Sequence, residues 1–220
     1  MSRILIDTLK RVADLRWLKL YEVDYEHLSG VRGKWQFASR KSQPSLDGSP
    51  LAAEAVFIVP LLKTPSGNRL VMTREFRVPL GDYEHSFPAG LRDAGEDIET
   101  TARRELAEET GLTLTKIHTL SPPVVSSAGM SDESAVIAFV ECEGTPHTDN
   151  AETSEDIHIL VVDFEQMRAL RQTAVKFSAK AWLVMLMFEA LGSIEWPSGV
   201  PLTSDRLPRQ ASHDSQHTSL

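Results

Sequence analysis

Three glutamates at helical spacing are the side chains of this sequence best suited to hold a divalent cation. Glu105, Glu108 and Glu109 stand at positions i, i+3 and i+4, so their carboxylates are expected to converge on one side of a helix. Like charges at this spacing cost an isolated helix about 0.2–0.5 kcal/mol per pair unless a cation lies between them. Magnesium prefers carboxylate and water oxygens and commonly bridges to substrate phosphates, so the pattern predicts a Mg2+ site.

The helix that must position these carboxylates is expected over residues 98–110. Ile98, Ala102 and Leu106 recur at four-residue spacing and predict a buried face. Gly111 follows as a residue that tolerates the left-handed conformation in which many helices end.

The segment before this helix is expected to approach it closely. Phe87–Gly90, FPAG, ends an extended run in a residue without a side chain. Glu96 and Arg104 are then predicted to form a charge pair that fixes the intervening loop against the helix. We assign Gly90, Glu96, Arg104 and Gly111 structural roles.

The stretch Gly90–Leu112 fits the pattern G-x5-E-x7-R-E-U-x-E-E-x-G-U, with U apolar, at every fixed position. This pattern is the Nudix box, and the chain therefore resembles Nudix hydrolases, which cleave nucleoside diphosphates linked to another group. The resemblance implies an α/β/α sandwich around a mixed sheet. It also implies that Glu105 and Glu109 are principal metal ligands, Glu108 a further or water-mediated ligand at the catalytic centre, and the Ala89 carbonyl a backbone ligand. Mn2+ is the alternative to Mg2+.

The flanking segments resemble those of ADP-ribose and ADP-sugar pyrophosphatases. Arg77, in the segment REFR, matches an arginine that contacts substrate in that group. Trp17, Trp35 and Arg40 match an N-terminal segment in which the two tryptophans of human-type enzymes sandwich adenine. The resemblance thus implies an adenine clamp, with Arg40 and Arg77 suited to pyrophosphate oxygens. From the pattern alone, ordinary packing of both tryptophans remains the alternative.

Two later loops also resemble this subfamily. Ser126–Glu133 is similar to its S-P-G-x-S/T-x-E loop, which implies that Glu133 binds substrate. Glu152–Ile157, ETSEDI, is similar to the acidic loop that carries the general base. Glu155 aligns best with that base, and Glu152 is the reserve candidate.

Two residues depart from the subfamily pattern. Ala128 replaces an expected proline, and Ser86 stands where a glutamate is usual. Both departures bear on the substrate rather than on the chemistry.

The composition limits the partners and the compartment. The net charge of −8 makes a nucleic-acid backbone an unsuitable partner. A single cysteine excludes an internal disulfide, and the first 15 residues lack the apolar run of a signal peptide. No segment approaches 18 uninterrupted apolar residues, so no membrane span is expected and we place the protein in the cytoplasm.

The remaining apolar patterns predict a sheet with helices on its faces. Residues 64–68, TPSGN, have the composition of a hairpin turn between two apolar runs. The expected strands are 55–63, 69–78, 135–142 and 157–162, and the expected helices are 164–171 and 179–191.

The chain is expected to contain three parts. Residues 1–50 are assigned to an N-terminal element with an antiparallel sheet from about Leu15 to Ala38 and a linker from Arg40 to Pro50. Residues 51–203 form the hydrolase domain, and residues 204–220 form a polar tail predicted to be disordered. In the resembling subfamily the N-terminal element exchanges contacts between protomers, which implies a homodimer with a composite site.

The expected function is Mg2+-dependent hydrolysis of ADP-ribose or a related nucleoside diphosphate sugar to AMP and a sugar phosphate. The alternatives are a Nudix hydrolase for ADP-glucose, GDP-mannose, NADH or a dinucleoside polyphosphate, since the box selects the reaction and not the leaving group. From another class comes a non-catalytic sensor that binds ADP-ribose.

Overall fold

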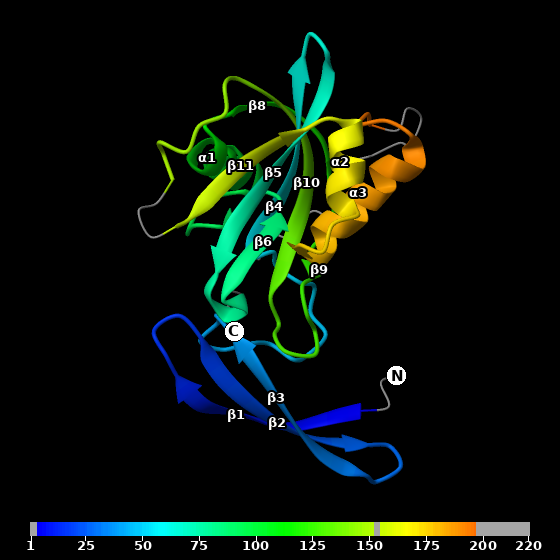
Figure 1. Ribbon diagram of the computed structural model, residues 1–220. Coiled ribbons are helices and arrows are strands. Elements are labelled where there is room, and N and C mark those ends of the chain that lie inside the picture. The colour runs from blue at the N-terminus through cyan, green and yellow to red at the C-terminus, as the bar shows by residue number, and fades with distance from the viewer. Residues whose placement is uncertain (1–3, 152–154, 197–220) are drawn as a thin grey trace, which may run out of the picture.

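The computed structural model describes residues 4–151 and 155–196 and contains two β-sheets (Figure 1). The N-terminal sheet consists of β1 (Ile4–Asp14), β2 (Lys19–His27) and β3 (Arg32–Ser39), all antiparallel. The larger sheet contains β4 (Ala55–Thr64), β5 (Gly67–Arg77), β6 (Asp82–Ser86), β7 (Ala89–Leu91), β8 (Thr113–Leu120), β9 (Val124–Val125), β10 (Ser134–Glu143), β11 (Ile157–Val162) and β12 (Lys176–Phe177). The helices are η1 (Val78–Leu80), α1 (Ile98–Thr110), α2 (Phe164–Arg171) and α3 (Ala179–Leu191).

The larger sheet is mixed, as expected. Its strand order is β12-β6-β5-β4-β10-β8, with β11 paired to β5, β7 to β4 and β9 to β10. Strands β4 and β10 run parallel, whereas β4 and β5 form the antiparallel hairpin predicted from the turn at residues 64–68.

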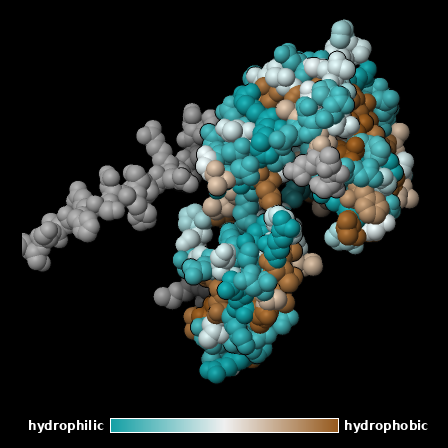
Figure 2. Space-filling model, turned by 90° about the vertical axis from the view of Figure 1, so that its left-hand side faces the viewer, coloured by the Kyte–Doolittle hydropathy of each residue, from teal (hydrophilic) through white to brown (hydrophobic). Residues whose placement is uncertain are grey.

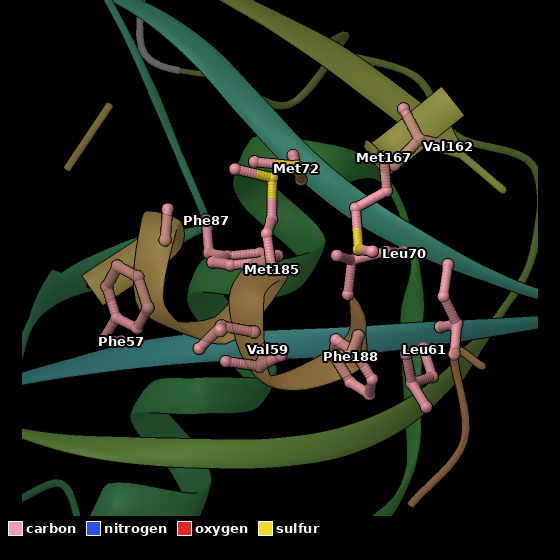
Figure 3. Packing of buried hydrophobic residues seen from close by; sticks show 13 residues of the cluster. Phe57, Val59, Leu61, Leu70, Met72, Phe87, Val162, Met167, Met185 and Phe188 are labelled. Atoms are coloured by element: carbon pink, nitrogen blue, oxygen red, sulfur yellow. The ribbon is translucent and has the colours of Figure 1, made fainter. Parts of the chain in front are cut away.

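Helices cover both faces of this sheet (Figure 1). On one face α1 packs through Ala102 and Leu106, both fully buried, against β4, β8 and β10. On the other face α3 packs through Met185 and Phe188 into a second cluster that also includes residues of β4 and β5 (Figure 3). The α/β/α sandwich is therefore confirmed.

Local capping explains why the helix that carries the three glutamates begins and ends where the sequence predicts. The Asp97 side chain accepts a hydrogen bond from the Thr100 amide at the first turn. Gly111 ends α1 in the left-handed conformation, with φ of 68°. A Cβ added at Gly111 would lie 2.4 Å from the His147 ring, so a larger residue would also displace that side chain.

The N-terminal sheet is larger than predicted. The sequence pattern placed its start near Leu15, but β1 begins at Ile4. Two register shifts, between Ile6 and Thr8 and between Arg11 and Ala13, interrupt the two-residue alternation by which a strand is recognised.

The division at residues 50 and 203 stays a prediction, and residues 204–220 lie outside the described part of the chain. No helix within residues 4–151 and 155–196 is long and apolar enough to cross a membrane.

The single cysteine offers a test of the packing between α1 and the sheet. Cys142, on β10, is 1% exposed, and burial raises the pKa of its thiol to about 12. We expect no labelling of the folded protein by a thiol reagent at pH 8 and one labelled thiol per chain in denaturant, measured by mass spectrometry. Rapid labelling without denaturant would contradict this packing.

Candidate active site

The segment expected to approach α1 does so at Gly90. Strand β7 is held against β4, with Gly90 opposite Val56 and Ala89 opposite Phe57. A Cβ at Gly90 would lie 1.9 Å from the carboxyl carbon of Glu105. Only glycine therefore leaves room for this carboxylate against the β7 backbone.

Replacing Gly90 with alanine should displace the Glu105 carboxylate and lower kcat roughly 100-fold, the order of loss that a misplacement of about 1 Å can cause. The measurement is the hydrolase activity of the variant and of the wild-type protein, compared once equal melting temperatures show that the variant is folded. Equal activity would show that Glu105 tolerates displacement.

Arg104 contacts Glu96 and two of the three glutamates predicted to hold a cation. Its guanidinium donates to both oxygens of Glu96 at 3.0 Å, so the predicted charge pair is present. It also contacts Glu105 at 2.8 Å and Glu108 at 3.0 Å, and donates to the Leu91 carbonyl at 3.0 Å. Arg104 thus links the loop after β7 to α1.

The three glutamates have different partners in the structure. Glu105 and Glu108 both contact Arg104, whereas the buried Glu109 accepts a hydrogen bond from the Ala89 amide. Within the described ranges, no three Asp, Glu, His or Cys side chains are already grouped as a ready-made metal site.

Glu109 is the most constrained acid of the site. Its side chain is buried, and its oxygen accepts a long hydrogen bond of 3.4 Å from the Ala89 amide. Burial raises the pKa of Glu109 well above the ordinary value, and the negative charges of Glu105, Glu75 and Glu155 raise it further. The negative charges of acids from α1, β5 and the loop before β11 therefore oppose the ionisation of Glu109.

These residues fit a divalent cation by their chemistry. A buried carboxylate surrounded by like charges is costly to ionise, and a bound cation would remove that cost. Burial also raises the pKa of Glu105, which Arg104 opposes. A cation that binds both Glu105 and Glu109 must therefore compete with Arg104 for the Glu105 carboxylate.

The arginines expected at the substrate lie at two places. Arg77, at the end of β5, contacts Glu75 at 2.5 Å and Glu84 at 3.4 Å. Arg40 follows β3 and approaches Glu133 at 3.7 Å. Arg40 also lines a cavity of about 330 Å³ with Lys41, Ala52, Ala53, Glu54, Leu91 and Arg92, so it reaches the loop that follows Gly90.

The two tryptophans do not face each other within one chain. Trp17 is 68% exposed in the turn before β2, with the Arg16 guanidinium 4.5 Å from its ring. Trp35 is 50% exposed and lines an apolar cavity of about 450 Å³ that Trp17 does not line. One chain alone therefore does not form the clamp.

Of the two candidates for the general base, Glu155 lies in the described chain and Glu152 lies outside it. Glu155 is exposed and lies two residues before Ile157, the residue of β11 that pairs with Glu75 on β5. Glu75 itself was not among the residues predicted from the sequence. The segment REFR could have indicated it, because residues two apart on a strand share a face. Glu75 lies two positions before Arg77 and is therefore expected beside it.

Comparisons with known proteins identify the family and its relatives. A family model described as "NUDIX domain" matches residues 53–183. The chain is 33% identical over 139 residues to "ADP-ribose pyrophosphatase" of Saccharomyces cerevisiae, covering 61% of this chain and 57% of the relative. It is 28% identical over 144 residues to "ADP-sugar pyrophosphatase" of Mus musculus, covering 64% of this chain and 62% of the relative.

The fold also matches a solved structure. A crystal structure of an "ADP compounds hydrolase" superposes with a TM-score of 0.65 over 87% of this chain and 97% of the other, at 24% identity. At that identity the likeness establishes the fold alone.

Proposed function

The chain belongs to the Nudix family, whose domain covers residues 53–183, and we propose that it hydrolyses the diphosphate bond of ADP-ribose or a related nucleoside diphosphate sugar. The observation that carries the proposal is the buried Glu109 beside Ala89, surrounded by the charges of Glu75, Glu105 and Glu155. The two relatives named for ADP-ribose and ADP-sugars support the substrate class.

In this proposal, Glu105, Glu108, Glu109 and the Ala89 carbonyl would hold the divalent cation, with Mg2+ favoured over Mn2+. When bound, such a cation neutralises charge on the diphosphate and lowers the pKa of a coordinated water. Glu155 accepts the proton of the attacking water. Arg40 and Arg77 donate hydrogen bonds to diphosphate oxygens, and the products are AMP and ribose 5-phosphate.

A panel of substrates tests the proposal. Phosphate released through a coupled phosphatase would be measured with ADP-ribose, ADP-glucose, GDP-mannose, NADH and diadenosine polyphosphates in Mg2+, with Glu109→Gln as the blank. A preference for ADP-ribose supports the proposed substrate. A stronger signal with GDP-mannose would overturn the substrate but keep the reaction, and tight ADP-ribose binding without turnover would favour a sensor.

We also propose that the N-terminal sheet forms a homodimer in which Trp17 and Trp35 of different protomers clamp adenine. Hydrophobic side chains gather on the surface of this sheet (Figure 2), among them Ile4, Leu5, Ile6, Leu9 and Val12, each at least 39% exposed. Apolar surface of this kind is typical of a protein interface. Sedimentation of a monomer at micromolar concentration would overturn this part of the proposal.

A further inference from the structure

Two carboxylates hold the guanidinium of Arg77 from two sides. Its Nη1 donates to Glu75 at 2.5 Å and its Nε donates to Glu84 at 3.4 Å. Glu75 on β5 is directly opposite Glu84 on β6, so both side chains project from the same face of the sheet. We call this arrangement of Glu75, Glu84 and Arg77 the arginine cradle.

The arginine cradle borders the acids of the candidate active site. Glu75 is only 14% exposed, and its charge interacts with those of Glu155 and Glu109. On the other side of β5, Glu75 is opposite Ile157 of β11, and Ile157 follows Glu155 by two residues. The cradle therefore lies beside the residue proposed as the general base.

The cradle engages two of the three guanidinium nitrogens of Arg77. A guanidinium carries five N–H donors in a planar fork, and its Nε and Nη1 are engaged here. Within the described part of the chain, Nη2 has no carboxylate or carbonyl partner, and the side chain is 41% exposed. Fixing two nitrogens removes rotamer freedom before a ligand arrives, which favours binding at the third.

We propose that Glu75 and Glu84 are positioning residues that hold Arg77 so that its Nη2 binds a phosphate oxygen of the substrate. This inference rests on the proposed function, because the phosphate is that of a nucleoside diphosphate sugar. The carboxylates do not touch the substrate and act through Arg77. Glu75 contributes more than Glu84, because its contact with the guanidinium is shorter and its side chain is less exposed.

A double-mutant cycle tests the cradle. Glu75→Ala is expected to raise KM for ADP-ribose roughly tenfold, the order that loss of one charge-assisted hydrogen bond produces, with kcat within about twofold because the metal-binding acids remain. Arg77→Ala should raise KM at least as much. Glu75→Ala combined with Arg77→Ala should be no worse than Arg77→Ala alone, since a positioning carboxylate has no effect without its arginine.

Two further comparisons complete the test: the conservative variant Glu75→Gln and the removal of an unrelated surface ion pair. Glu75→Gln keeps an oxygen that accepts from Nη1 and should recover most of the loss in KM. Glu165→Ala with Arg168→Ala removes another surface ion pair, of 3.2 Å on α2, and should leave KM unchanged. Additive losses in the Glu75/Arg77 double variant, or a fall in kcat rather than a rise in KM, would overturn the positioning role.

Failure of the proposed function gives a different result. If the wild-type protein turns over none of the panel, the function fails before any variant is compared. If the wild type is active and Arg77→Ala leaves KM unchanged, the cradle alone is overturned. Melting temperatures of all variants identify any that fail to fold, and the Glu75→Gln comparison then carries the test.

Discussion

Replacing Glu109 with glutamine is expected to lower kcat by roughly 10²–10³, the order of loss seen when one group that stabilises the transition-state charge is removed. Glutamine has nearly the shape of glutamate but carries no charge, so it should weaken the divalent cation site without creating a cavity. The buried position of Glu109, accepting from the Ala89 amide, leaves little room for another ligand to replace it.

The same substitution should raise stability when no divalent cation is present. The pKa of Glu109 is raised in the folded state by burial and by neighbouring acids, so the folded chain holds this proton more tightly than the unfolded chain does. The stability that this proton contributes is fully present below the unfolded pKa of about 4.3 and is lost as pH rises through the folded pKa. At neutral pH, glutamine avoids that loss.

Melting temperatures in EDTA and in Mg2+ measure how the substitution changes stability without and with the cation. The wild type should melt lower than Glu109→Gln in EDTA and should gain more from Mg2+, since a ligand stabilises the state to which it binds. Glu99→Gln, which changes the same charge on the exposed face of α1, is the control. A variant that lost stability in EDTA while keeping its response to Mg2+ would contradict a metal role for Glu109.

The parts of the fold that local chemistry determines could be predicted from sequence. Helix α1 begins at Ile98 and ends at Thr110 because Asp97 caps its first turn and Gly111 ends it. The bounds of α2 and α3 follow in the same way from capping by Asp163 and Ser178. Such signals act within a few residues and do not depend on the rest of the chain.

Contacts between distant segments could not be predicted in this way. The pattern of the box placed three carboxylates on one helix, but it did not indicate that Arg104 would hold Glu105 and Glu108. The arginine cradle depends on the register that sets Glu75 opposite Glu84, and strand register is a property of the assembled sheet. The sequence therefore indicated Arg77 and Arg104 as site residues, but not the contacts of Arg104 with Glu105 and Glu108 or the pairing that sets Glu75 and Glu84 beside Arg77.

Glu155→Gln is expected to lower kcat by roughly 10²–10⁴, the range attributed to general acid–base catalysis, if Glu155 is the base. KM should change little, because the metal-binding acids and Arg77 remain. The melting temperature should keep its response to Mg2+, which separates this variant from Glu109→Gln. Glutamine can still accept a hydrogen bond from water but cannot take its proton, so the loss falls on the chemical step.

The neighbouring residue supplies the control for this substitution. Asp156 accepts a hydrogen bond of 2.5 Å from the Tyr83 hydroxyl and lies 3.1 Å from His158, so its carboxylate already has two partners. Asp156→Asn makes the same change of charge one position along the loop and should cost far less in kcat. If Glu155→Gln stayed within a few fold of wild type, the base would have to be another group. Glu152 would then be tested by the same substitution, because it belongs to the same acidic loop.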